Sequence, residues 1–175
     1  MIAVGATSHL SDEDLASIIA YIRTIPPVDH VLAGKQFTPL AKRLFAARVL
    51  PNMPVEEVSH EVNVSAPEWS ASVEYGEYAV NIDDCRSCHG PQLNGGPFPH
   101  PAITRISPNL TPGGELAFWT EDDFINTILT GTTPGGHELD PKLMPWNEFR
   151  NLHDYELQAI WLCLQSLPKL PQNTQ

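Results

Sequence analysis

The stretch "CRSCHG", residues 85–90, decides the fold of this chain. Two of the three cysteines lie here, three positions apart, with a histidine directly after the second. A C-x-x-C pair can be a thiol redox centre, half of a zinc site or, with the histidine, a covalent haem attachment site. A four-ligand zinc site lacks donors, because Cys163 stands alone and no H-x₃₋₅-H pair is present. A redox pair needs flanking strands, and the sequence around Cys85 shows no strand alternation.

Haem attachment is the remaining interpretation, and its chemistry explains the spacing. The thiols of Cys85 and Cys88 add to the two vinyl groups on one edge of the porphyrin. Two intervening residues give the separation that fits both vinyls on one helical turn. His89 then brings its imidazole to the iron as the proximal ligand. The motif therefore predicts one covalent haem c.

The second axial ligand of an electron-transfer haem is often methionine. Of the three methionines, Met1 is terminal and Met53 lies upstream of the motif, whereas Met144 follows it in "KLMPW". A residue before proline sits on a stiff, extended segment that can hold a thioether against the haem. Met144 is the favoured ligand. Met53 and a bis-histidine arrangement using His100 or His137 stay open, although exposed loop positions are the simpler interpretation of those histidines. The same interpretation applies to His9, His30, His60 and His153.

Composition bounds the remaining choices. The chain has 175 residues, 42% of them hydrophobic, which predicts one domain with appendages. Its net charge of −11 argues against nucleic-acid binding and suits a partner with a basic face, although acidity also serves solubility. No apolar run approaches the roughly 18 residues of a membrane span. No basic leader is visible, so an exported form would have been processed, or the sequence starts downstream of its natural start.

Hydrophobic periodicity predicts short helices joined by proline-rich loops. We expect helices over 71–84, 119–131 and about 154–167, with residues 91–118 as loop. Gly76 lies inside the first helix, where a close helix crossing would explain it. Thr120 and Asp123 form a capping-box pattern, and Gly131 ends that helix. The expected core residues are Val73, Tyr75, Tyr78, Ala79, Val80, Phe124, Ile125, Ile128, Leu157, Ile160, Trp161 and Leu164, with Cys163 as a small packed side chain.

An internal repeat connects the two ends of the chain. Residues 10–28 align without gaps with residues 152–170, and both segments match in capping acid and terminal proline. The repeat predicts that residues 1–28 are the last helix of an upstream cytochrome-like domain. We expect the apolar face of this helix to pack on the haem domain or on a partner. That face consists of Leu15, Ile18, Ile19, Ile22 and Ile25.

The predicted domain organisation follows from these patterns. Residues 29–70 form an extended linker with one short helix at 38–50. Residues 71–170 form the mono-haem domain, and residues 171–175 are a tail. The predicted class is all-α, a class I cytochrome c fold of short helices and long loops with an N-terminal helical extension.

The haem motif, "SPNLTPGG", "FWTEDDF" and "LMPWNEF" together resemble the class I c-type cytochromes. More narrowly, they are similar to the cytochrome c domains in cytochrome subunits of bacterial membrane-bound dehydrogenases. The resemblance covers about residues 71–168 and implies a periplasmic location. It also implies thioethers at Cys85 and Cys88, iron ligands His89 and Met144, a haem lining of Pro108, Asn109 and Leu110, and Trp119 or Trp146 near the propionate edge.

The function expected from these residues is one-electron transfer, with no catalytic residues of its own. Donor and acceptor would be proteins, such as a dehydrogenase or oxidase subunit, in a larger complex. Arg86 and Arg105 are candidates to neutralise a propionate. The alternative is an open or labile distal site, which would make the protein a small-ligand sensor or a peroxidase-like enzyme.

Overall fold

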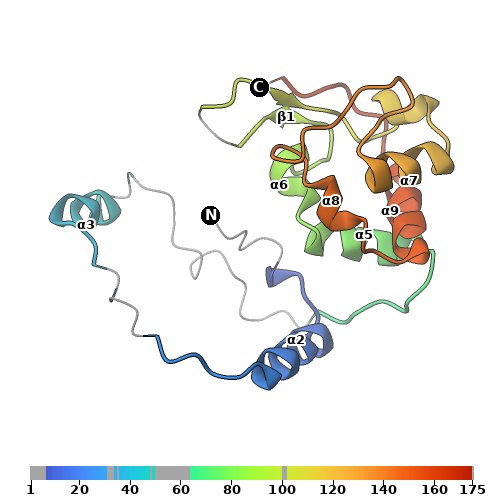
Figure 1. Ribbon diagram of the computed structural model, residues 1–175. Helices are drawn as coiled ribbons and strands as arrows, with labels where there is room; N and C mark the ends of the chain where they lie inside the picture. The colour runs from blue at the N-terminus through green and yellow to red at the C-terminus, as the bar shows by residue number, and fades with distance from the viewer. Residues whose placement is uncertain are drawn as a thin grey trace.

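The chain is mostly helical with little strand, as Figure 1 shows. Within the described ranges, no helix combines the length and the apolar character that crossing a bilayer requires. The name "C-terminal body" is used below for the described residues from 64 to 174. The computed structural model describes residues 7–30, 34, 36–47, 49, 64–99 and 102–174.

Helix α5, Val73–Ile82, leads into the cysteine motif. It begins because the Ser72 hydroxyl accepts a hydrogen bond from the Tyr75 backbone N–H at 3.2 Å. Val73 was expected in the core but is 39% exposed, at the first residue of the helix. The buried residues of the helix are Tyr75, Gly76, Tyr78, Ala79 and Val80.

Helix α9, Asp154–Ser166, crosses α5 at close range (Figure 1). A Cβ at Gly76 would lie 1.9 Å from the Ala159 carbonyl oxygen and 2.7 Å from the Cys163 Cβ. The crossing therefore requires glycine, as the sequence predicted. The face of α9 that is buried contains Leu157, Ala159, Ile160, Trp161, Cys163 and Leu164, which confirms the expected stripe.

Helix α7, Glu121–Thr130, lies within the expected range 119–131 and has the expected cap residues. The Thr120 hydroxyl accepts from the Asp123 N–H, and the Asp123 carboxylate accepts from the Thr120 N–H. Gly131 ends the helix with φ +73°, a conformation that favours glycine. Its core-facing residues are Phe124, Thr127 and Ile128.

Short elements lie in the segments that were expected to be loops. Strands β1, Gly96–Pro97, and β2, Ile106–Ser107, form an antiparallel pair. A 3₁₀ turn spans Glu115–Phe118, and helix α8 spans Trp146–Phe149. The expectation of plain loop over 91–118 was therefore wrong in detail. Elements of two to four residues are too short to produce a hydrophobic period.

The N-terminal extension contains helices α2, Asp12–Thr24, and α3, Pro39–Ala46. The start of α2 is tied to the C-terminal body through Tyr78 on α5. The Tyr78 hydroxyl accepts from the Ser11 backbone N–H at 3.0 Å and donates to the Asp14 carboxylate. Helix α2 is thus anchored at its first turn.

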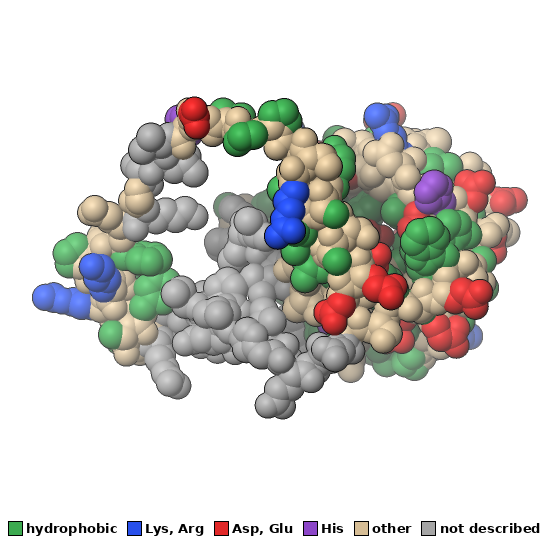
Figure 2. Space-filling model, turned by 90° about the horizontal axis from the view of Figure 1, so that it is seen from below, with side chains coloured by type: hydrophobic (Ala, Val, Ile, Leu, Met, Phe, Trp, Pro, Cys, Tyr) green, Lys and Arg blue, Asp and Glu red, His purple; other side chains and the backbone are tan. Residues whose placement is uncertain are grey.

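The apolar face of α2 is exposed beyond that anchor. No residue of α2 itself is buried, so within the described residues this face does not pack on the C-terminal body, and the expected packing on a partner stays a prediction. The hydrogen bonds between this end of the extension and α5 involve polar groups of Ser11, the N-cap, and of Asp14 in the first turn of α2. Figure 2 shows apolar side chains among the exposed atoms of the extension. The exposed fractions are 42% for Leu15, 42% for Ile18, 41% for Ile19, 56% for Ile22 and 53% for Ile25.

A carboxyl group is buried where α5 ends against α9. Asp83 caps α5, with its N–H bonded to the Ala79 carbonyl at 2.8 Å. Its Oδ2 atom is buried and has no hydrogen-bond partner among the described residues. Glu156 on α9 is held nearby by the Tyr75 hydroxyl at 3.1 Å and the His153 N–H at 2.7 Å. Burial, and then the charge of Glu156, raise the pKa of Asp83 to about 6.

Replacing Gly76 tests the helix crossing. We expect Gly76→Ala to destabilise the protein by about 1–3 kcal/mol or more, because the added methyl overlaps the backbone of α9. Gly135→Ala is the matched control, since its nearest neighbour would be Thr133 Oγ1 at 4.0 Å. Chemical denaturation of wild type and of both variants measures the effect. Equal stability of the two variants would contradict the close crossing.

Replacing Asp83 tests its burial. In the unfolded chain an aspartate has a pKa of about 3.9. The folded protein therefore binds a proton more tightly, and stability falls as pH rises from about 4 to about 6. Because Asp83→Asn removes this group, the free energy of unfolding of the variant relative to wild type should rise across that window, by up to about 3 kcal/mol.

Denaturation curves at a series of pH values from 4 to 7 measure this difference. Glu77→Gln, on the exposed side of the same helix, is the control and should follow the wild-type pH dependence. A constant difference between Asp83→Asn and wild type at every pH would show that folding does not shift the pKa of Asp83.

Candidate functional site

The cysteine motif forms a helix of its own, α6, Cys85–His89. Asp84 turns the chain out of α5 with φ +60°, and Gly90 ends α6 with φ +79°. The Asp84 carboxylate also accepts from the Ser87 hydroxyl. Left-handed residues at both ends therefore isolate a single helical turn. This turn places both cysteines and the histidine within one short, fixed element.

His89 is the buried member of the motif, with 7% of its surface exposed. Its Nδ1 lies 2.9 Å from the carbonyl oxygen of Pro108. A carbonyl only accepts, so Nδ1 carries the proton and Nε2 keeps its lone pair. Burial lowers the pKa of His89, and the Pro108 bond partly opposes this. Metal-binding histidines adopt the same state: the imidazole is neutral, and the ring nitrogen that does not bind the metal donates its hydrogen to a carbonyl.

The loop that carries Pro108 is built around a buried side chain. Asn109 is 4% exposed, and its carbonyl oxygen accepts from the Thr111 N–H at 2.9 Å and hydroxyl at 2.8 Å. Its amide nitrogen donates to the Leu170 carbonyl at 2.7 Å. The Leu110 N–H donates to the Leu93 carbonyl at 2.8 Å. Of the three predicted haem-lining residues, Pro108 contacts His89, whereas Asn109 is used to shape the loop itself.

Both motif cysteines are half-buried free thiols. Burial, followed by the charge of Asp83, raises the pKa of Cys85 to about 12. Burial also raises the pKa of Cys88. Redox cysteines depend on a lowered pKa that makes them thiolates. These thiols stay neutral, which disfavours the redox interpretation and agrees with addition of S–H groups to vinyls.

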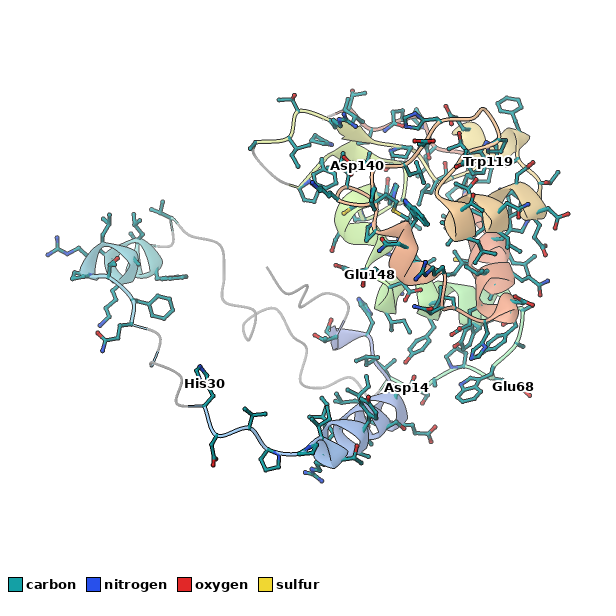
Figure 3. All side chains as sticks on the ribbon, in the orientation of Figure 1. Asp14, His30, Glu68, Trp119, Asp140 and Glu148 are labelled. Carbon is teal, nitrogen blue, oxygen red and sulfur yellow. The ribbon has the colours of Figure 1, made fainter. Side chains whose placement is uncertain are left out.

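Met144 packs against the same core cluster as Cys85. It closes a turn that starts at Asp140, labelled in Figure 3, through an N–H bond of 3.0 Å to the Asp140 carbonyl. Its own carbonyl accepts from the Trp146 N–H at 2.7 Å. The backbone of Met144 is thus held on both sides, and its side chain is half-buried. This placement suits a thioether ligand.

The two tryptophans predicted near the propionate edge have different surroundings. The Trp146 indole N–H donates to the Leu139 carbonyl at 3.1 Å. Its ring covers Gly131, where a Cβ would lie 2.2 Å from Trp146 Cε2. Trp119 is half-buried against the core and lines a surface hollow with Phe118. The Trp146 ring therefore packs within its own loop, whereas part of the Trp119 side chain is exposed to solvent.

The Arg86 side chain forms hydrogen bonds with residues on both sides of the motif. Its Nε donates to the Asn81 side chain at 2.8 Å, and Nη1 donates to the Pro91 carbonyl at 2.5 Å. These bonds connect the end of α5 with the loop after α6. Arg105, the other predicted propionate partner, is exposed on the strand loop.

The remaining candidate ligands lie elsewhere. Among the described histidines outside the motif, all four have exposed side chains, as expected for loop residues: His9, His30, His137 and His153. Met1, Met53, His60 and His100 fall outside the described residues.

Sequence reasoning missed one residue of this site. Gln172 lies in the segment that was expected to be a tail. Its side-chain amide nevertheless forms hydrogen bonds with the Ser107 carbonyl and the Asn109 N–H, on either side of Pro108. No pattern in the sequence pointed to it, because a single polar residue after the last helix has no period, pair or spacing.

Comparisons with known proteins agree with a cytochrome. No family model matches the chain. The cytochrome c subunit of a quinone-dependent alcohol dehydrogenase from Gluconobacter oxydans is 31% identical over 99 residues, which cover 52% of this chain and 20% of that protein. One of the subunits of nicotinate dehydrogenase from Pseudomonas putida is 32% identical over 106 residues, which cover 56% of this chain and 9% of that protein. The matches thus span a fifth or less of each relative. Over about half its length, the chain is similar to subunits of two dehydrogenases, one of them a cytochrome c subunit.

Proposed function

We propose that this chain is a mono-haem c-type cytochrome that carries single electrons within a dehydrogenase complex. The observation that carries the proposal is the state of His89, a buried, neutral imidazole that directly follows two free thiols and is fixed by Pro108. That arrangement prepares Nε2 for iron and the thiols for vinyl groups. The similarity to dehydrogenase subunits supports the complex, and the periplasmic location is part of the proposal.

The bound haem would supply an iron that changes between ferric and ferrous states. The residues of the chain hold that group and keep its ligands fixed. Cys85 and Cys88 would attach it, and His89 and Met144 would bind its iron. Because both axial positions would be filled, no position is left for a substrate. The protein then influences the reaction only through ligand strength, burial and nearby charge.

The proposal extends to the segment before this domain. Residues 1–28 would be the end of an upstream cytochrome-like unit. Helix α2 supports this, because Asp12 and Thr24, its end residues, align in the repeat with Asp154 and Ser166, the end residues of α9. The aligned face is buried in α9 and exposed in α2, so among the described residues no helix covers α2 as α5 covers α9. The division of the chain into domains stays a prediction.

The ligands are tested by spectroscopy and two matched variants. The purified protein should contain one covalent low-spin haem, measured as a pyridine haemochrome, with the far-red band of ferric iron bound to methionine sulfur. Met144→Ala should abolish that band, lower the midpoint potential and open the iron to cyanide. Met53→Ala, which changes the other methionine–proline pair, should leave all three unchanged.

Two results would contradict this ligand set. A high-spin ferric spectrum in the wild type would favour the sensor or peroxidase-like alternative. An unchanged potential in Met144→Ala would transfer the distal role to Met53 or to a histidine.

The acidic surface gives a second prediction. Figure 2 shows Asp and Glu side chains spread over the face drawn, and the whole chain carries a net charge of −11. Reduction of the ferric protein by the cation hexaammineruthenium(II) should slow as salt rises, and oxidation by the anion ferricyanide should accelerate. Stopped-flow rates from about 10 mM to 1 M salt measure both, over which the screening length falls from about 30 to 3 Å.

If neither reagent responds to salt, the acidic groups do not surround the exit point of the electron. Their role would then be solubility.

A further inference from the structure

The segment after α9 returns to the loop that holds the proximal histidine. In Figure 1 this segment runs from the end of α9 to the C-terminus beside β1. The Pro171 carbonyl accepts from the Asn94 amide at 3.1 Å, and the Asn173 N–H donates to the Asn94 carbonyl at 2.9 Å. The Leu170 N–H donates to the Thr111 hydroxyl at 3.3 Å. These bonds make residues 170–173 a strap across the loop after His89 and the loop of Pro108.

Gln172 lies at the centre of this strap and bonds both peptide groups that flank Pro108. Its Oε1 accepts from the Asn109 N–H at 3.0 Å, and its Nε2 donates to the Ser107 carbonyl at 3.0 Å. The Asn109 N–H and the Pro108 carbonyl belong to one peptide group. That carbonyl accepts from His89 Nδ1 at 2.9 Å. A continuous chain of hydrogen bonds therefore runs from Gln172 through this peptide to the imidazole.

The surrounding backbone leaves room for this contact. Gly95 has φ +82°, and a Cβ there would lie 2.0 Å from Gln172 Nε2 and 2.4 Å from the Ser107 carbonyl oxygen. A Cβ at Gly113 would lie 2.0 Å from the Leu170 carbonyl oxygen. Two glycines thus permit the strap to approach at hydrogen-bond distance. The residue itself stays exposed on its outer side.

We propose that Gln172 is a positioning residue for the proximal ligand, acting through the peptide group between Pro108 and Asn109. An acceptor on the N–H side of a peptide polarises it and strengthens its carbonyl as an acceptor. A stronger bond at Nδ1 makes the imidazole a more electron-donating ligand and favours ferric iron. Gln172 thereby fixes the orientation of His89 and lowers the potential. This inference rests on the proposed haem-binding function.

The test measures the midpoint potential and the solvent exchange of the His89 Nδ1 proton by NMR in the haem-loaded protein. Gln172→Ala should raise the potential and accelerate the exchange, because the peptide loses its partner. Gln172→Glu keeps the acceptor for the Asn109 N–H, so its proton exchange should stay close to wild type. Gln165→Ala is the matched control, since Gln165 donates to the Leu116 carbonyl at 3.2 Å in another loop, and neither readout should change.

The outcomes separate this inference from the function on which it rests. Unchanged potential and exchange in Gln172→Ala, with normal haem content, would overturn the role of Gln172 and leave the cytochrome intact. The same change in Gln165→Ala as in Gln172→Ala would also overturn it, because the effect would not be specific to the Pro108 loop. A wild-type protein without histidine-ligated covalent haem would overturn the proposed function itself.

Discussion

The close crossing of α5 and α9 at Gly76 is the constraint on which the rest of the structure depends. Helix α5 runs from this crossing directly into the α6 motif. Helix α9 runs from it toward the strap of residues 170–173. One contact, made possible by a missing side chain, therefore sets the position of both His89 and the segment that supports its carbonyl partner. Packed helices transmit such geometry well, because tightly packed interiors deform little.

The electrostatic surroundings of the motif follow from the same packing. Burial keeps His89 neutral, raises the pKa of both motif thiols and raises the pKa of Asp83. Each shift has desolvation as its main cause. The site is thus built by exclusion of water more than by charge pairs. An apolar setting of this kind disfavours a charged imidazole and charged thiolates, and it suits a large, mostly apolar prosthetic group.

The sequence predicted the helices well because each had a local signal. The helix after Trp119 had its capping box at Thr120 and its glycine stop at Gly131, and the last helix had an apolar stripe that ended before Pro168. The close approach at Gly76 was also foreseeable, since glycine is costly inside a helix. These features depend on neighbours in the sequence, which a single chain displays directly.

Features that depend on distant residues were not predictable. Gln172 bonds a loop more than sixty positions away, and nothing near it in sequence indicates that contact. The two hydrogen bonds of Arg86, to Asn81 and Pro91, span only five positions each, but no period or spacing in the sequence indicated them. The apolar face of α2 is exposed, although it was expected to pack on this domain or on a partner. Its amphipathic pattern shows that a partner surface is needed, but not whether this chain supplies it.

The positive φ angles at Asp84 and Gly90 give the motif a fixed length. Each residue added to a helix rotates the following side chains by about 100°. One extra residue between Cys88 and the end of α6 would therefore swing the imidazole away from the Pro108 carbonyl, even if both sulfurs kept their places. The interval from the second sulfur to the ring would in this way be set twice, by the shape of the proposed haem and by the Pro108 carbonyl oxygen of the chain's own backbone. This site can then tolerate amino-acid substitutions, but not insertions or deletions.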